Sequence, residues 1–361
     1  MHCASLGEFE QGRPILESIR KNYPNGKMVL SFFSPSGYEI RKDYPGADLV
    51  VYLPLDTPQN ARDFLELIQP DLVIFVKYEY WRNFFQEIRA RGLPFLQVSA
   101  IFQPHQLFFR WYGRGWRKHL RSMTALFVQD KSSADLLNSI EVKQVIVSGD
   151  TRFDRVLAIC NTFESISKIE QFCAGRNILV AGSTWAPDEL ALSALAERFS
   201  DLALIVAPHE IQEDHLQQLE KLFPDSIRYS ALDSDKASHG QVLIIDNIGL
   251  LSRLYHYATI CYVGGGFGAG IHNTLEAAVH GRPVIFGPHH QKFREAKELI
   301  ACGGAFTIRH KEELILCVEK LLENEEVLLQ SSRAAADYVR QNSGSTEIIL
   351  RYIQEKRLLT S

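Results

Sequence analysis

Four glycines stand close together between an apolar run and a predicted helix: Gly264, Gly265, Gly266 and Gly268. The apolar run, residues 258–263, is typical of a short buried strand, and the helix is predicted to begin at Asn273. Because glycine has no Cβ, a ligand can approach the backbone closely at such a turn. The start of the next helix presents unpaired N–H groups and the positive end of a dipole. The pattern predicts a phosphate or carboxylate site at the carboxyl edge of a parallel sheet.

Two other interpretations fit the same glycine segment. Asn273 and Glu276 have the spacing of a capping box, in which Glu276 only fixes its own helix. Gly264, Gly266 and Ala269 fit the G-x-G-x-x-A pattern of a dinucleotide site. That pattern belongs in the first strand–helix unit, with an acidic residue about 20 positions later. Here it lies late in the chain, and the next strand ends without an acid. A nicotinamide or flavin site is therefore disfavoured, and no cofactor is predicted.

Glu8 is the candidate for acid–base chemistry. It follows Gly7 at the predicted start of a helix, on the ligand edge of the first predicted sheet. A helix N-terminus stabilises a carboxylate in its ionised form, which is able to accept a proton. The alternative is structural, because Ser5 lies three residues earlier, at the spacing of a capping box.

Two further turns carry polar side chains directly after predicted strands of the second half. Ser183 and Thr184 offer hydroxyl and amide groups that suit phosphate, although helix capping is the commoner use of these residues. His209 and Glu210 follow the next strand, where a histidine either donates to an anion or is only a polar surface residue. Because parallel strands end at one edge, we expect these turns and the glycine segment to converge on one crevice, across from Glu8.

Residues 103–121 combine cations and aromatic rings without a single acidic residue. The cations are Arg110, Arg114, Arg117, Lys118 and Arg121, and the rings are Phe108, Phe109, Trp111, Tyr112 and Trp116. This mixture suits a membrane interface or an anionic amphiphile. Stacking on RNA bases is one alternative, and a solvated helix with a buried aromatic side is another. Gly113 and Gly115 argue against one uninterrupted helix.

Short β-rich runs alternate with helical patterns almost throughout the chain, which predicts parallel sheets built from βαβ units. Strands are predicted over 27–33, 48–53, 71–76, 95–99, 125–129 and 144–148, and then over 177–181, 202–207, 241–245, 258–263 and 283–286. Residues 2–4 look like the tail of a further strand. Either this strand is short, or residues that preceded Met1 are absent.

These elements predict an α/β fold with two Rossmann-like, parallel-sheet domains that face a cleft. We expect a first domain over 1–150, a helical connector over 151–176, a second domain over 177–340, and a C-terminal helix over 341–361 that packs back on the first domain. A chain of 361 residues is long for one core and comfortable for two.

The composition is that of an ordinary globular protein, with 46% hydrophobic and 23% charged residues. The net charge of −4 argues against general nucleic-acid binding. The six cysteines show no C-x-x-C pairing and are interpreted as reduced thiols rather than as a disulfide or zinc framework. No apolar run approaches 18 residues, so no membrane-spanning helix or signal peptide is predicted.

Six stretches, in this order, resemble the 3-deoxy-D-manno-octulosonic acid (Kdo) transferase family. They are HCASLGE at 2–8, LPLDTPQNARDFL at 53–65, QPDLVIF at 69–75, GDTRFD at 149–154, AGSTW at 181–185 and VGGGFGAGIHNTLEAA at 263–278. The combination of S-x-G-E with GGGFG and HN-x-x-E is specific, whereas each motif alone is not.

The resemblance implies a GT-B glycosyltransferase that transfers Kdo from CMP-Kdo to a lipid A precursor in lipopolysaccharide biosynthesis, with inversion and without a metal ion. Glu8 matches the general base. The donor would be bound by Arg152, Ser183, Thr184, His209, Glu210, Gly264, Gly265, Gly266, Phe267, Gly268, His272, Asn273 and Glu276. We expect the acceptor to be bound by Ser5, Gly7, Glu79, Arg110 and Arg114.

The expected partners are CMP-Kdo, a lipid A precursor and the membrane surface, with no nucleic acid. The expected place is the cytoplasmic face of the inner membrane, with peripheral attachment. Only the second acid of the family's E-T-E-L-W-P-N motif is present, as Glu79, and Arg152 stands where the family has a lysine. Another nucleotide-sugar GT-B enzyme, such as a UDP-sugar transferase or a 2-epimerase, and a non-catalytic sugar-nucleotide or lipid-binding protein are the alternatives.

Overall fold

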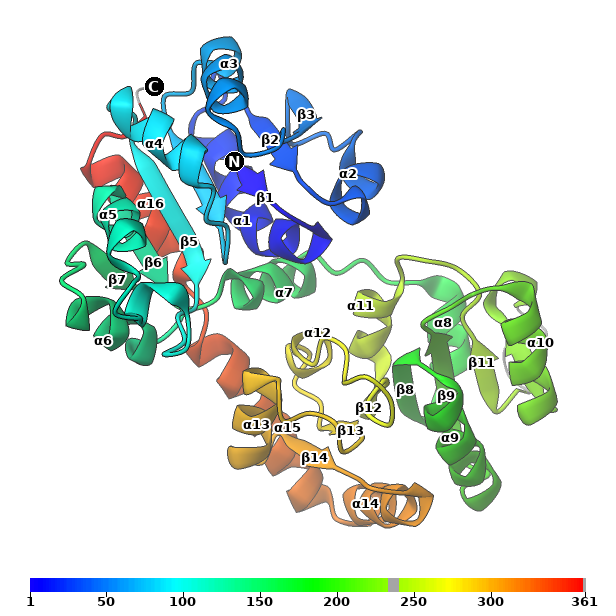
Figure 1. Ribbon diagram of the computed structural model, residues 1–361. Coiled ribbons are helices and arrows are strands. Elements are labelled where there is room, and N and C mark those ends of the chain that lie inside the picture. The colour runs from blue at the N-terminus through cyan, green and yellow to red at the C-terminus, as the bar shows by residue number, and fades with distance from the viewer. Residues whose placement is uncertain (233–239, 360–361) are drawn as a thin grey trace. The chain divides into compact units, whose positions relative to one another are not determined.

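The buried apolar runs of this chain form two parallel sheets, each in its own compact unit. The computed structural model describes residues 1–232 and 240–359. The first unit contains residues 1–155 and 342–359, and the second contains residues 156–341 (Figure 1). Each unit has a seven-stranded sheet, and every strand pair between the described residues is parallel. The prediction of two Rossmann-like α/β units is therefore confirmed.

The first sheet has the strand order β3-β2-β1-β4-β5-β6-β7. Its strands are β1 (His2–Cys3), β2 (Val29–Phe32), β3 (Leu49–Tyr52), β4 (Val73–Val76), β5 (Phe95–Ala100), β6 (Ala125–Val128) and β7 (Val145–Val147). Its helices are α1 (Leu6–Asn22), α2 (Pro35–Arg41), α3 (Pro58–Ile68), α4 (Arg82–Ala90), α5 (Arg114–Ser122), α6 (Lys131–Ser139), the start of α7 (Thr151–Asn161), and α16 (Ser345–Glu355), with a 3₁₀ turn, η1 (Leu107–Phe109).

Two apolar clusters cover the two faces of the first sheet. On one face, α1 and α16 bury Phe9, Ile15 and Ile349 against β1, β2 and β4. On the other face, α3 to α6 bury aromatic side chains such as Phe84 and Phe85 against β4 to β6. The C-terminal helix thus packs in the first unit, as predicted, although it is separated by about 190 positions from the rest of that unit.

The second sheet has the strand order β10-β11-β9-β8-β12-β13-β14. Its strands are β8 (Asn177–Thr184), β9 (Leu202–Pro208), β10 (Ser226–Arg228), β11 (Val242–Ile244), β12 (Ile260–Val263), β13 (Val284–Phe286) and β14 (Ala305–Thr307). Its helices are α8 (Ser167–Cys173), α9 (Ala186–Arg198), α10 (Glu213–Leu222), α11 (Leu251–Leu254), α12 (Leu275–Ala278), α13 (Arg294–Ala301), α14 (Lys311–Glu323) and α15 (Glu325–Gln341), with the 3₁₀ turns η2 (Tyr229–Ala231) and η3 (Tyr255–Tyr257).

The structure corrects the predicted elements in two ways. First, β10 and β14 were not predicted, and both are three-residue strands at the two edges of the second sheet. An edge strand lacks one neighbour and is only partly buried, so its sequence carries no long apolar run. Second, the helix predicted from Asn273 begins at Leu275 and has four residues. Its dipole is therefore that of one turn only, which weakens the expected contribution of this helix to anion binding.

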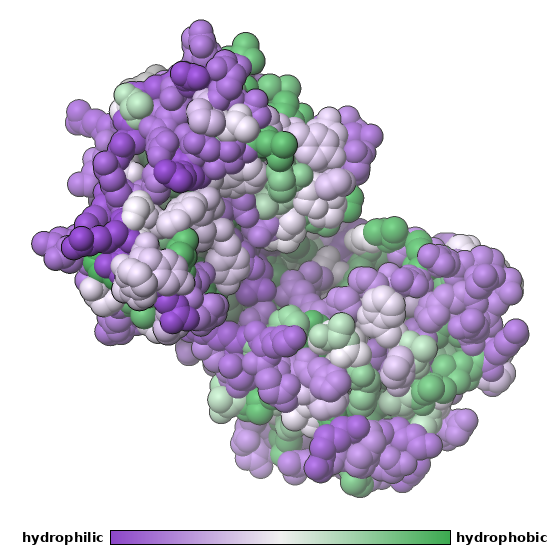
Figure 2. Space-filling model, in the orientation of Figure 1, coloured by the Kyte–Doolittle hydropathy of each residue, from purple (hydrophilic) through white to green (hydrophobic). Residues whose placement is uncertain are grey.

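None of the helices in the described part of the chain has both the length and the apolar character needed to cross a bilayer. On the face that Figure 2 shows, apolar side chains interrupt the hydrophilic surface in separate patches.

Candidate functional site

Glu8 lies in the first turn of α1, directly after the short strand β1. Ser5 occupies the N-cap position in an extended conformation, but its side chain makes no capping bond to the helix backbone. Instead, the Ser5 hydroxyl donates a hydrogen bond to the Glu8 carboxylate. The side chain of Glu8 is half-buried, and Gly7 is exposed, with nothing closer to its missing Cβ than the Ser5 Oγ at 3.8 Å. The capping-box alternative is therefore not observed on the Ser5 side, and the carboxylate stays open to a ligand.

A second acid lies at the same edge of the first sheet. Glu79 follows β4, accepts a hydrogen bond from the indole N–H of Trp81, and lies with its Oε2 3.6 Å from Nε2 of the buried His2. Burial raises the pKa of the Cys3 thiol well above its usual range, and the carboxylates of Glu8 and Glu79 both add to this shift. Both carboxylates thus lie close to the end of β1, where the sequence predicted an acceptor site.

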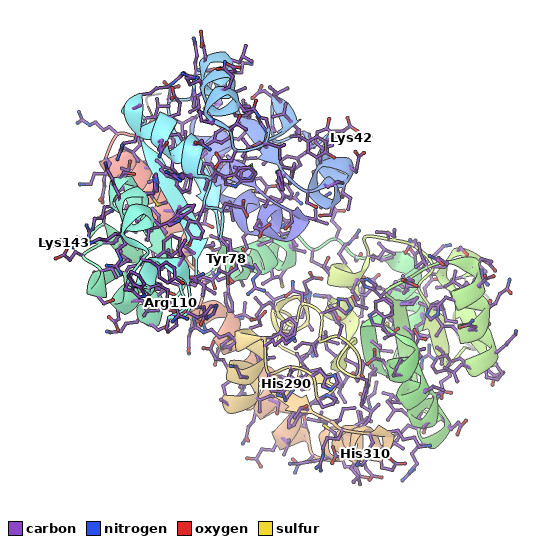
Figure 3. The ribbon with its side chains drawn as sticks, viewed as in Figure 1. Lys42, Tyr78, Arg110, Lys143, His290 and His310 are labelled. Atoms are coloured by element: carbon purple, nitrogen blue, oxygen red, sulfur yellow. The ribbon has the colours of Figure 1, made fainter. Side chains whose placement is uncertain are left out.

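Arg152 belongs to the first unit, at the start of α7. Its guanidinium lies 2.8 Å from Oδ2 of the buried Asp150, whose Oδ1 also accepts from the side-chain amide of Gln11 at 3.1 Å. Tyr78 lies beyond the carboxyl ends of the strands (Figure 3). Burial raises the pKa of its phenol, and the Arg152 charge opposes this shift. The negative charges of Asp150, Asp130 and Glu8 add to the rise in this pKa.

Residues 103–121 fold as a 3₁₀ turn followed by a helix, not as one helix. A Cβ on Gly113 would overlap the carbonyl oxygen of Leu107, so a glycine is required where the chain turns into α5, while Gly115 lies inside α5. Phe108 is buried and Trp116 packs against the core. In contrast, Trp111 is 87% exposed and Tyr112 is 58% exposed.

The exposed rings are flanked by exposed cations. Arg114 is the first residue of α5, and Arg110 lies at the surface, where its Nε donates to the carbonyl of His105 at 3.3 Å (Figure 3). The segment is thus divided between an inward aromatic side, as one alternative predicted, and an outward cluster of Trp111, Tyr112, Arg110 and Arg114.

In the second unit, the first glycines of the loop after β12 serve close packing of backbones. A Cβ on Gly264 would clash with the backbone of Ser183 and would lie 2.7 Å from the Cα of Thr184. A Cβ on Gly266 would lie 2.5 Å from the nitrogen of Gly287. Gly265 has φ +87, which only glycine adopts freely. These three glycines are thus explained without a ligand, whereas Gly268 is exposed and has open space around it.

Some amides of this loop are already occupied and some are not. The amide of Gly264 donates to the carbonyl of Gly182 at 2.9 Å, and the amide of Gly268 donates to the carbonyl of Gly265 at 3.0 Å. Among the described residues, no acceptor is found for the amides of Gly266, Phe267 and Ala269. The side chain of Phe267 packs against the core, so only the backbone of this residue is available to a ligand at the loop. Unpaired amides in a turn suit an anion.

A buried carboxylate that the sequence analysis did not single out fixes the position of this loop. Asp188, 1% exposed, accepts hydrogen bonds from the Tyr262 hydroxyl at 2.7 Å, from the Gly265 amide at 2.9 Å and from the Trp185 amide at 3.0 Å. Burial raises its pKa, and the three hydrogen bonds oppose this rise. The spacing of Trp185 and Asp188, an N-cap residue followed by an acid at N3, was the signal in the sequence.

We expect Asp188→Asn to destabilise the second unit by about 1–3 kcal/mol, because an amide cannot accept all three hydrogen bonds and leaves a buried donor unpaired. Urea unfolding of the full chain, followed by circular dichroism, measures this change. Asp201→Asn, on an exposed turn, is the control and should alter the free energy of unfolding by less than about 0.5 kcal/mol. Equal stability of the two variants would contradict the structural role of Asp188.

Three rings from the three expected turns form one stack. The rings of Trp185 and His209 have centroids 4.7 Å apart, and those of His209 and His272 have centroids 4.5 Å apart. The indole N–H of Trp185 donates to Nε2 of His272 at 3.0 Å. Burial and the neighbouring His209 lower the pKa of His272, which keeps the ring neutral and able to accept this bond. The turns after β8, β9 and β12 are thus brought together. Trp185 takes part in this stack, although the sequence analysis did not name it as a site residue.

The other predicted donor residues differ in how available they are. Thr184 is buried and its hydroxyl donates to Glu189 at 2.9 Å, so this side chain already has a partner in the interior, and its role at the donor stays a prediction. Ser183 is half-buried and Glu210 is exposed.

Asn273 accepts from the Leu275 amide at 3.2 Å and donates to the Glu276 carboxylate at 2.9 Å, which orients Glu276 beside the glycine loop. In the described residues, no group of three or more His, Cys, Asp and Glu side chains is arranged to hold a metal ion.

The chain is similar in sequence to 3-deoxy-D-manno-octulosonic acid transferases. Residues 1–155 match the family model described as 3-deoxy-D-manno-octulosonic-acid transferase (kdotransferase). The 3-deoxy-D-manno-octulosonic acid transferase of Aquifex aeolicus is 28% identical over 89% of this chain and 85% of its own length, and that of Haemophilus influenzae is 25% identical over 97% and 85%.

Solved structures agree in fold. UDP-GlcNAc 2-epimerase from Neisseria meningitidis has a TM-score of 0.69 at 16% identity, over 98% of both chains. MurG from Acinetobacter baumannii has a TM-score of 0.60 at 13% identity, also over 98% of both chains. At this identity the likeness shows the two-domain GT-B fold alone. In sequence, the chain is thus similar to 3-deoxy-D-manno-octulosonic acid transferases, over residues 1–155 in the family model and over most of the chain in the individual relatives.

Proposed function

We propose that this chain transfers Kdo from CMP-Kdo to a lipid A precursor, with inversion, without a metal ion, and with Glu8 as the general base. The observation that carries this proposal is the Glu8 carboxylate, which stands half-buried at the carboxyl edge of the first sheet and is held by the Ser5 hydroxyl. Relatives that bear the name of this activity align with nearly the whole chain and support the assignment.

In the proposed reaction, the Glu8 carboxylate accepts the proton of the acceptor hydroxyl while that oxygen attacks the anomeric carbon of Kdo. The bond between this carbon and the phosphate oxygen breaks, and CMP leaves with the electron pair. Attack from the side opposite to the leaving group inverts the anomeric centre. Ser5 keeps the carboxylate in position by donating to one of its oxygens. Glu79 and the exposed Gly7 lie at the same edge and are the proposed acceptor contacts there.

The donor is assigned to the second unit. The free amides of Gly266, Phe267 and Ala269 suit the phosphate or the Kdo carboxylate, and they stabilise negative charge on the leaving group without a cation. The Trp185–His209–His272 stack provides a flat aromatic surface next to the loop. Glu276 is proposed to bind the ribose hydroxyls, and Ser183 and Glu210 remain proposed donor contacts of this unit. Arg152, which belongs to the first unit, remains a proposed donor contact from the resemblance alone.

For the acceptor lipid, we assign the outward cluster of Trp111, Tyr112, Arg110 and Arg114. Exposed indole and phenol rings prefer the boundary between lipid and water, and the arginines attract anionic headgroups. This chemistry supports peripheral attachment to a membrane surface, and the place we propose is the cytoplasmic face of the inner membrane.

Replacing Trp111 by serine should weaken binding to vesicles that contain anionic lipid, because the indole is 87% exposed and packs against the likewise exposed Tyr112, so the main loss is that of interfacial transfer. Sedimentation with phosphatidylglycerol vesicles measures the effect, and we expect roughly a three- to tenfold drop in affinity. Leu190→Ser, at an exposed apolar position in the second unit, is the control. An equal drop in both variants would speak against the cluster.

The decisive experiment is a transfer assay with CMP-Kdo and a lipid A precursor, in the presence and absence of EDTA. Formation of a Kdo-lipid product that EDTA does not reduce supports the proposal. Calorimetry with CMP and UDP tests the donor: tighter binding of UDP would favour another nucleotide-sugar enzyme. Binding of CMP with no turnover on any lipid acceptor would instead favour a non-catalytic protein.

A further inference from the structure

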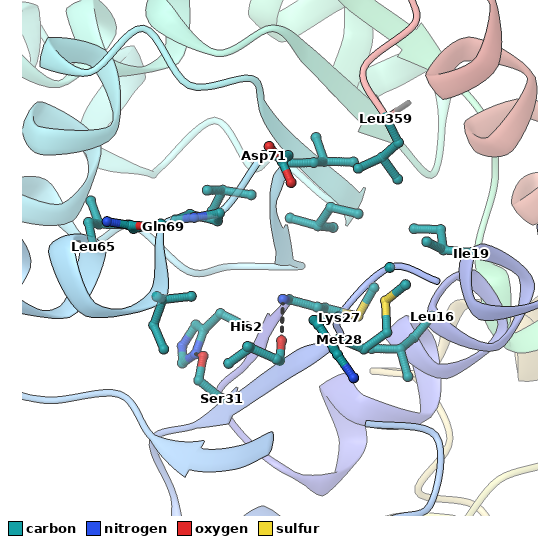
Figure 4. A pocket seen from close by; sticks show the side chains of 18 of the residues that line it. His2, Leu16, Ile19, Lys27, Met28, Ser31, Leu65, Gln69, Asp71 and Leu359 are labelled. Atoms are coloured by element: carbon teal, nitrogen blue, oxygen red, sulfur yellow. Dashed lines mark hydrogen bonds between the residues drawn. The ribbon is translucent and has the colours of Figure 1, made fainter. Parts of the chain in front are cut away.

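A cavity in the first unit lies away from the proposed chemistry. Its volume is about 400 Å³, and it is lined by apolar side chains such as Leu16 and Leu65 (Figure 4). Val29 and Val73, which begin β2 and β4, also line it, whereas Glu8 lies beyond the carboxyl end of β1. The unpaired amides of the second unit are therefore the better candidates for a ligand contact.

The turn after β13 binds two carbonyl groups of the glycine loop. The backbone N–H of His289 donates to the carbonyl of Gly266 at 2.9 Å, and Nδ1 of its ring lies 2.7 Å from the carbonyl oxygen of Gly268. Because a carbonyl oxygen only accepts, Nδ1 carries the proton in this contact and donates it to the hydrogen bond. One residue thus holds two peptide units of the loop.

These two hydrogen bonds set the direction of two unpaired amides. The peptide bonds of the loop are trans, and in a trans peptide unit the N–H points opposite to the C=O. The Gly266 carbonyl shares its peptide unit with the N–H of Phe267, and the Gly268 carbonyl shares its unit with the N–H of Ala269. Both N–H groups therefore point away from His289. Neither has an acceptor among the described residues.

The unit between Gly268 and Ala269 has little support besides the His289 ring. Gly268 and Ala269 are both exposed, and the next residue, Gly270, has φ +140. Glycines on both sides of a peptide unit let it rotate without a Cβ clash. Phe267 differs, because its side chain is packed in the core. The direction of the Ala269 amide therefore depends on the imidazole of His289.

We propose that His289 is a positioning residue for the donor: its ring fixes the peptide unit between Gly268 and Ala269, so that the amides of Phe267 and Ala269 are held in place for the phosphate of CMP. This assignment rests on the proposed function, in which the same amides bind the donor. A loop that is already ordered does not lose backbone entropy when the phosphate binds, so the ring contributes to affinity without touching the ligand.

Three variants test this assignment. His289→Ala removes the ring, whereas His289→Asn keeps an N–H donor at the same number of bonds from Cα. His290→Ala is the matched control, because it removes a ring of the same turn (Figure 3) whose Nδ1 lies 3.4 Å from the Thr307 hydroxyl instead of the loop. His289 is exposed, so the melting temperature of each His289 variant should stay close to that of the original chain.

Calorimetry with CMP measures the effect on the ligand. We expect His289→Ala to bind CMP roughly five- to thirtyfold more weakly, which is the cost of ordering the backbone of one residue. His289→Asn and His290→Ala should stay within about twofold of the original chain. Cytidine, which lacks the phosphate, should bind equally to all four proteins. A loss of cytidine affinity as large as the loss for CMP would contradict the assignment to the phosphate.

Backbone order parameters from NMR relaxation measure the same peptide unit without a ligand. In His289→Ala, the order parameter of the Ala269 amide should fall from about 0.85 to below about 0.6, and in His289→Asn it should remain high. An unchanged order parameter in His289→Ala, or a CMP affinity that His289→Asn does not restore, would overturn the proposal. If the original chain bound no CMP while the order parameters changed as expected, the proposed function would fail and the positioning by His289 would stand.

Discussion

Replacing Glu8 by glutamine is expected to lower kcat for Kdo transfer by roughly 10²–10⁴-fold, the range typical for loss of a general base. Glutamine keeps the size of the side chain and still accepts a hydrogen bond from Ser5, but it cannot take the proton of the acceptor hydroxyl. The KM for CMP-Kdo should change little, because the donor is assigned to the second unit. Steady-state kinetics with both substrates varied measures the two parameters separately.

The control for this experiment is Glu66→Gln, an exposed acid on α3 that should leave kcat unchanged. Ser5→Ala provides a graded comparison, since it removes only the hydrogen bond that orients Glu8. We expect its kcat to fall, but by much less than that of Glu8→Gln. Near-normal turnover of a correctly folded Glu8→Gln protein would rule out Glu8 as the base and would contradict the proposed mechanism of transfer.

Gly264→Ala is expected to destabilise the second unit by about 3 kcal/mol, at the upper end of the overpacking range, and to abolish CMP binding. The added Cβ would clash with the Ser183 backbone and approach the Thr184 Cα to 2.7 Å, and neither backbone atom can move aside as a flexible side chain does. The turn after β8 and the glycine loop would have to separate, which would disrupt the loop amides and the Trp185 stack. Urea unfolding and calorimetry with CMP measure the two effects.

Gly268→Ala is the matched control, because it makes the same chemical change in the same loop. Its Cβ would meet nothing closer than the Gly265 carbonyl oxygen at 3.7 Å, so we expect stability within about 0.5 kcal/mol of the original chain. If CMP lies against Gly268, this variant should bind it more weakly without losing stability. Equal destabilisation by both alanines would contradict the packing assigned to Gly264.

Prediction from the sequence was accurate for the central strands and failed for the short edge strands and for one helix start. The central strands were predicted within a few residues, because each is a short apolar run buried on both faces. β10 and β14 were missed, because edge strands of three residues are only partly buried and have no such run. The helix after the glycine segment was predicted to begin at Asn273, whereas α12 begins at Leu275. The Asn273 side chain does accept a hydrogen bond from a backbone amide, but that amide belongs to Leu275, the first residue of the helix.

The alternation of apolar strands and helices, the two-sheet fold and the polar turns after the strands could be predicted from the sequence, since all of these depend on neighbours along the chain. What those turns contact could be seen only in the folded chain. Gly264 needs to be glycine because of Ser183, and Asp188 matters because of Tyr262 and Gly265. Trp185 finds its partner in His272, 87 positions away. Such partners are set by packing between distant segments, which leaves no periodic signal in the sequence.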